Sequence, residues 1–168
     1  MITLDDSELL ALQYLITYIS LSSYKFSKLT DIPSATAWRV FNRLAELGLV
    51  RKEEKGFRIT PRGAVIAYIF IDKEHVRIQA LKLLKNLWDY NGNEEGLRYF
   101  IEDLLKVLRK LNISPFMVCF NQPITLVPLL LNKVSEISDK TKEVIAMFLL
   151  KFFPTITLDG CKVILSFD

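Results

Sequence analysis

The chain has 168 residues, with 22 lysines and arginines, 19 aspartates and glutamates, one histidine and two cysteines. Hydrophobic residues make up 51% of the sequence, which suffices for one globular domain or for two small ones that share a core. The abundant apolar residues and nearly balanced charge exclude intrinsic disorder. Cys119 and Cys161 are too few to staple a chain of this length, so we expect reduced thiols and a cytoplasmic location.

We expect no segment that crosses a membrane or directs secretion. The most apolar stretch near the start, 9–21, is interrupted by polar residues and is shorter than the roughly 18 uncharged residues that a bilayer requires. It follows three acidic residues, whereas a secretory signal begins with basic ones. The apolar content is high for so short a chain, which predicts that a second copy covers part of the surface as a homodimer.

Charge is distributed unevenly along the sequence. Residues 1–33 carry four acids and two bases, whereas residues 34–62 carry seven bases and three acids, a net charge of +4. All residues after 62 contribute only +1. Because concentrated positive charge attracts anionic partners, a nucleic-acid site is expected within 34–62.

The first predicted elements are two helices that end at a proline. Apolar residues at spacings of three and four predict a helix over 7–22, capped by a side chain among residues 5–7. A short helix is expected over 26–30. Pro33 then interrupts the chain, because proline lacks an N–H and disfavours helical backbone in the residue before it.

A third helix is predicted over 34–47. Ser34 is expected to cap its start, and Gly48 is expected to end it with a left-handed residue. The apolar residues of this segment fall on one helical face. They are Ala37, Val40, Phe41, Leu44 and Leu47.

A tight hairpin is predicted next, with strands over 49–51 and 57–60 around a turn over 53–56. A further helix follows from Pro61 to residue 71. In the rest of the chain we expect helices over 73–88 and 94–111, separated by a loop at 91–93. The pattern does not classify 117–120 and 124–131, whereas 143–153 is long enough for a buried helix. The final prediction is a hairpin with strands over 155–158 and 162–167 around Asp159-Gly160.

The element order of the first half carries a resemblance. The residues that carry it are Ser34-Ala35-Thr36-Ala37, Arg39, Arg43-Leu44, Leu47-Gly48-Leu49-Val50-Arg51 and Ile59-Thr60-Pro61-Arg62-Gly63. In these features residues 7–71 resemble the winged helix-turn-helix family of archaeal and bacterial transcription regulators, which includes the MarR and ArsR groups. The resemblance implies a mainly α fold with a small β wing. It gives a winged helix-turn-helix domain at 1–71 and a helical C-terminal region at 72–168 that ends in a β-hairpin.

The resemblance also implies a DNA-binding transcription regulator. The helix Ser34–Leu47 would lie in the major groove, and the wing 51–58 would lie on the DNA backbone. On residue chemistry, hydroxyls and amides contact base edges, arginine contacts guanine or phosphate, and a helix N-terminus holds phosphate. Trp38 has a second interpretation, as part of the core or of a protein interface. The candidate DNA-binding residues are Ser34, Thr36, Trp38, Arg39, Asn42, Arg43, Lys52, Lys55 and Arg58.

The expected partners are double-stranded DNA and a second copy of the chain, and two alternatives stay open. Winged helices also serve as protein–protein interaction modules in larger assemblies. The chain could instead bind a small-molecule effector among Phe116, Met117, Phe120 and the C-terminal hairpin, although ordinary core residues have the same composition. For the homodimer, the exposed faces of 94–111 and 143–153 are the candidates.

We expect no enzymatic activity, no metal and no cofactor. His75 is the one histidine and is expected on the surface near a helix start. One histidine and two distant cysteines lack the spacing of a metal site. The sequence also contains no phosphate-cradling glycine loop and no nucleophile motif.

Overall fold

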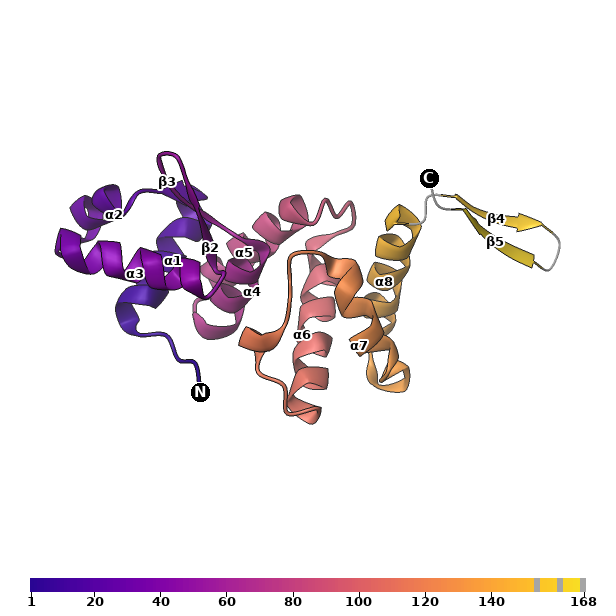
Figure 1. The fold of residues 1–168 in the computed structure, drawn as a ribbon. Coiled ribbons are helices and arrows are strands. Elements are labelled where there is room, and N and C mark those ends of the chain that lie inside the picture. The colour runs from indigo at the N-terminus through magenta and orange to yellow at the C-terminus, as the bar shows by residue number, and fades with distance from the viewer. Residues whose placement is uncertain (153–154, 160–161, 167–168) are drawn as a thin grey trace.

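The computed structural model describes residues 1–152, 155–159 and 162–166 (Figure 1). The chain is mainly helical, with a small three-stranded antiparallel sheet in its first half and a two-stranded sheet near its end. This agrees with the predicted mainly α fold that carries little β structure. Figure 1 shows the first three helices and the larger sheet gathered at one end of the molecule, with the helices of residues 61–87 beside them and the helices after residue 93 further along.

The first helix, α1 (Asp6–Tyr18), begins with a reciprocal cap. The Asp5 carboxylate accepts from the Glu8 N–H at 2.8 Å, and the Glu8 carboxylate accepts from the Asp5 N–H at 2.8 Å. The prediction that this helix reaches residue 22 is wrong. Ile19 ends it with a positive φ of 66°, and Ser20–Leu21 form a short strand, β1, instead.

Helices α2 (Ser23–Thr30) and α3 (Ser34–Glu46) follow on either side of the break at Pro33. Ser34 does not cap α3 as predicted, because Pro33 occupies the capping position and no side chain caps the helix. The Ser34 hydroxyl lies 3.3 Å from the hydroxyl of Ser27 in α2 instead. Gly48 follows α3 with a φ of 72°, which confirms the predicted left-handed residue.

The three-stranded sheet has the order β1–β3–β2, with β2 (Val50–Glu53) and β3 (Gly56–Ile59) forming the predicted hairpin. The closing strand β1 pairs with β3 and had no signal in the sequence pattern. Four of the five apolar residues predicted to line the buried face of α3 are buried, and Leu47 is half-buried.

A chain of aromatic rings joins α1, α2, α3 and the sheet. Tyr14 lies against Phe26 with ring centroids 5.6 Å apart, Phe26 lies 5.3 Å from Phe41, and Phe41 lies 5.2 Å from Phe57. Aromatic pairs in this distance range add stabilisation beyond the area that they bury. These contacts fix the position of α3, so the face of α3 opposite them is the face that solvent reaches.

Helices α4 (Pro61–Phe70), α5 (Glu74–Leu87) and α6 (Glu94–Lys110) match the predicted helices to within one residue at each end. Trp88, just after α5, packs edge-on against Phe100 and Phe148, and its indole N–H donates to the Phe120 carbonyl at 2.8 Å. The buried residues of both halves of the chain form one continuous cluster, which crosses the predicted domain boundary after residue 71.

The segment that the pattern left unclassified contains short helices. Three-residue and four-residue 3-10 helices occupy Pro115–Met117, Pro123–Leu126 and Val134–Glu136, with α7 (Val127–Leu131) between the last two. Helix α8 (Asp139–Phe152) begins four residues earlier than the pattern indicated. The terminal strands β4 (Thr155–Asp159) and β5 (Lys162–Ser166) pair as predicted, while Phe153, Gly160, Cys161 and Phe167 lie outside the described residues. None of the described helices is long and apolar enough to cross a membrane.

Candidate nucleic-acid interface

The outer face of α3 presents a mixture of small, aromatic and basic side chains. Ser34 and Arg39 are exposed, and the Trp38 side chain is 57% exposed. Thr36 and Asn42 of the same helix are half-buried. This exposure excludes the interpretation of Trp38 as a core residue of the isolated chain.

Two of these side chains have local partners. Arg39 donates to the Thr36 hydroxyl at 3.4 Å, which is at the long end of the hydrogen-bond range. Asn42 donates from its amide to the Trp38 carbonyl at 2.7 Å. The Arg39 guanidinium is therefore weakly held, whereas the Asn42 amide is held by a good hydrogen bond that leaves its second N–H and its carbonyl oxygen available.

Arg43 is held by the start of the chain. Its Nε lies 2.6 Å from a carboxylate oxygen of Glu8, whose side chain is only 4% exposed, and one of its Nη atoms donates to the Thr3 carbonyl at 3.1 Å. Charge-assisted hydrogen bonds of this kind are roughly twice as strong as neutral ones. Arg43 therefore links α3 to α1 through this ion pair. The pairing with Glu8 was not predicted from the sequence, where only a cap among residues 5–7 was expected.

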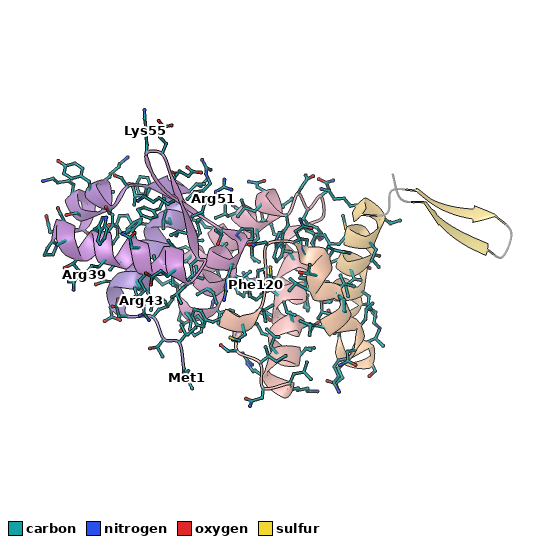
Figure 2. All side chains as sticks on the ribbon, in the orientation of Figure 1. Met1, Arg39, Arg43, Arg51, Lys55 and Phe120 are labelled. Carbon is teal, nitrogen blue, oxygen red and sulfur yellow. The ribbon has the colours of Figure 1, made fainter. Side chains whose placement is uncertain are left out.

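The β2–β3 hairpin carries four basic residues, Arg51, Lys52, Lys55 and Arg58. Lys52 and Lys55 are exposed and form no ion pair within the described residues, and Figure 2 shows Lys55 at the hairpin tip. Arg58 and Arg51 both approach one oxygen of Glu53, at 2.6 Å and 3.5 Å. The hydrogen bond from Arg58 holds the pKa of the Glu53 carboxyl below its usual range. The two lysines are thus more available to an anion than Arg58 is.

Helix α2 contributes two further cations that the sequence reasoning did not assign to the site. Lys25 lies 5.2 Å from the ring centroid of Tyr18, and Lys28 lies 5.3 Å from that of Tyr24. Both lysines are exposed. They fall outside the basic window 34–62, and only the packing of α2 against α3 brings them near it.

In the helical region, the sequence indicated an effector pocket around residues 116–120 and dimer faces on the helices now described as α6 and α8. Phe116 and Phe120 are buried, which fits the core interpretation, whereas Met117 is 77% exposed. Outward residues of α6 are largely charged, and those of α8 include Met147 and Leu150.

His75 and Cys119 are exposed surface residues. No group of three histidines, cysteines, aspartates or glutamates within the described residues could hold a metal ion.

Comparison of the chain with family models, with curated proteins and with solved structures finds no match. The site is therefore judged by its own chemistry. It offers guanidinium and ammonium groups, an amide, hydroxyls and an exposed indole on neighbouring elements. Such groups bind polyanions and stack on flat surfaces, and they resemble the composition of nucleic-acid interfaces.

Proposed function

We propose that the protein is a cytoplasmic, non-enzymatic regulator of transcription that binds double-stranded DNA through a winged helix-turn-helix domain in residues 1–71. The order α1–β1–α2–α3–β2–β3 and the strand order β1–β3–β2 support this domain type. In the proposal α3 enters the major groove and the β2–β3 hairpin lies on the backbone as the wing.

One observation carries the proposal. The exposed strip of α3 with Arg39 and Trp38 is followed directly by a hairpin whose Lys52 and Lys55 have no ion-pair partner among the described residues. Exposed cations on two adjacent elements can neutralise phosphates on both sides of a groove. Arg39 is the proposed base-reading or phosphate-binding residue, and Arg43 keeps a supporting role through Glu8.

A homodimer is part of the proposal, because two copies of α3 can read two half-sites one helical turn apart. The exposed apolar residues of α8, Met147 and Leu150, support this helix as the contact. The outward face of α6 carries Glu102, Lys106 and Arg109, which makes it a weaker candidate than the sequence suggested.

Fluorescence anisotropy with a mixed-sequence DNA duplex over a range of salt concentrations tests the proposal. Arg39→Ala should weaken binding by about 1–3 kcal/mol if the guanidinium contacts a base, and by less if it contacts phosphate. The double variant Lys52→Ala plus Lys55→Ala should reduce the salt slope by about 1.8, because each lost phosphate contact removes about 0.9. Arg109→Ala removes an exposed cation of α6 and is the control. Failure of the folded parent to bind at low salt rejects the proposal.

A protein-docking module is the second candidate, because exposed apolar side chains also gather on α2 and α3. Tyr24 is 65% exposed, Trp38 is 57% exposed and Leu29 is 42% exposed. Large exposed aromatic residues are typical anchors of protein interfaces. The anisotropy experiment separates the two candidates, since a docking module would show no salt-dependent binding to DNA.

A further inference from the structure

A cleft of about 600 Å³ lies between the base of the β2–β3 hairpin and the helical region. One wall consists of hairpin residues that include Arg51, Lys52 and Arg58, and the other includes Leu87 and Asn121. Figure 2 shows Arg51 on the side of the hairpin toward the helical region. Among the described residues, no aspartate or glutamate lines the cleft.

The positions of the two arginines of this wall, Arg51 and Arg58, disfavour the stability of the folded chain. Arg51 and Arg58 are direct partners in the register of β2 and β3, so their side chains leave the same face of the sheet. Like charges directly opposite each other on neighbouring strands are destabilising. Glu53 approaches both, and one carboxylate cannot neutralise two guanidinium groups. The wall therefore keeps an excess of positive charge.

A fourth cation, Arg62, lies beside a lining residue of the cleft but does not line the cleft itself. Gly48 is a lining residue, and a Cβ atom built on it would lie 3.6 Å from a guanidinium nitrogen of Arg62. The Nε of Arg62 is buried and has no hydrogen-bond partner among the described residues. The charge of Arg62 therefore adds to the positive potential beside the cleft.

We propose that this cleft binds the phosphate group of a phosphate ester. A phosphate monoester carries close to two negative charges and three acceptor oxygens, which suit several cations, whereas a carboxylate is matched by one arginine. The cleft is larger than a bare phosphate requires and falls within the usual range for organic ligands. Its apolar wall at Leu87 and the Asn121 amide can hold the organic part.

Two sources can supply phosphate-ester oxygens: a small organic phosphate monoester, which carries close to two negative charges, or a phosphodiester of bound DNA, which carries one and is the weaker match. Since Lys52 and Arg58 also belong to the proposed wing, a small phosphate in the cleft would compete with DNA for these side chains. This competition depends on the proposed DNA binding, whereas the phosphate site is inferred from the residues of the cleft alone.

Calorimetric titration of the full chain with AMP, at constant ionic strength, tests the small-ligand source. We expect saturable binding of the parent, a dissociation constant raised at least tenfold in Arg51→Gln and in Arg58→Gln, and no change in Arg109→Gln. Arg51→Gln should fold normally, because it relieves repulsion and gives up only a 3.5 Å contact to Glu53. Arg58→Gln also gives up the 2.6 Å ion pair with Glu53, so the thermal melting of both variants is recorded alongside. Equal binding by Arg51→Gln and Arg109→Gln overturns the site.

Duplex DNA tests the other source with the same variants. If AMP does not bind but Arg51→Gln weakens duplex binding at least tenfold relative to Arg109→Gln, the cleft holds backbone phosphate. If AMP does not bind and Arg51→Gln leaves duplex binding unchanged, the inference is wrong while the proposed function stands. If AMP binds as expected and no duplex binds, the cleft is confirmed and the proposed function is wrong.

Discussion

Two buried carboxylates, one in each half of the molecule, are satisfied in opposite ways. In the N-terminal region Glu8 faces a cation, Arg43, at 2.6 Å and also caps α1. In the helical region Asp103 accepts from the Ser138 N–H at 2.8 Å, the Ser138 hydroxyl at 3.0 Å and the Thr141 hydroxyl at 2.6 Å. These neutral donors lie at the start of α8.

The difference shows how each region uses its charged residues. Asp103 fixes the start of α8 through neutral donors, and the cation that approaches it, Lys106, is exposed and 3.9 Å away. The other charged residues of α6 and α8 lie at or near the surface. Glu8 instead forms an ion pair with Arg43, a basic residue of the candidate recognition helix. The number of arginines in 34–62 therefore overstates the number that are free to contact DNA. Arg43 forms an ion pair with Glu8, and Arg58 forms one with the half-buried Glu53.

The largest effect is expected from Asp103→Ala. Removing the carboxylate leaves two hydroxyls and one N–H of the α8 start without their acceptor, which should lower the free energy of unfolding by about 3 kcal/mol. Urea denaturation measures the change. DNA affinity of the folded variant should equal that of the parent, and a large loss of affinity would contradict the separation between the two regions.

A smaller loss is expected from Glu8→Gln. The variant breaks the ion pair with Arg43, whose side chain is half exposed, and should lower the free energy of unfolding by about 1–2 kcal/mol. Removal of a negative charge alone would strengthen DNA binding. We expect weaker binding instead, because α3 loses the ion pair that links it to α1. Anisotropy at fixed salt shows whether the DNA affinity rises or falls. Arg43→Ala should reproduce the stability loss.

Tyr68 of α4 provides a pH-dependent test of the contact between α4 and Glu102 of the helical region. Burial, and then the hydrogen bond to Glu102, raise the pKa of Tyr68 to about 12. A raised pKa of a neutral acid stabilises the fold below the unfolded value of about 10, and this stabilisation is lost as the pH rises toward 12. Tyr68→Phe should cost about 1 kcal/mol at neutral pH through the lost hydrogen bond. Denaturation between pH 9 and 12 should show a shallower decline for Tyr68→Phe than for the parent.

The smallest effect on stability is expected from Arg39→Ala. Its guanidinium has only the long contact to Thr36, so the free energy of unfolding should change by less than about 0.5 kcal/mol. DNA binding should nevertheless weaken, as stated for the anisotropy experiment. A stability loss as large as that of Arg43→Ala would show that Arg39 too is structural.

Local features of the fold could be predicted from the sequence. The helices 61–71, 73–88 and 94–111 follow from regular apolar spacing, and Gly48 follows from its position after a helix. The segment around 115–136 could not be classified, because Pro115, Pro123 and Pro128 divide it into turns too short for periodicity.

Contacts between distant residues could not be predicted. Strand β1 exists because Ser20 and Leu21 pair with Arg58 and Phe57, far along the chain. The role of Arg43 depends in the same way on Glu8, in another helix. Ser34 has the right chemistry for a cap, but Pro33 holds the capping position and the Ser34 hydroxyl meets Ser27. The location of the candidate site stays a prediction, whereas the partners of its side chains could be found only from the folded structure.

The two tryptophans of the chain lie in opposite surroundings, and this makes the protein its own optical reporter. Trp88 is 4% exposed among aromatic rings, so its emission should shift to longer wavelength when the core opens. Trp38 is 57% exposed on α3, so a molecule that docks there should quench or shift its emission without touching Trp88. Trp38→Phe leaves a pure unfolding signal, and its difference from the parent spectrum isolates a binding signal from the same sample.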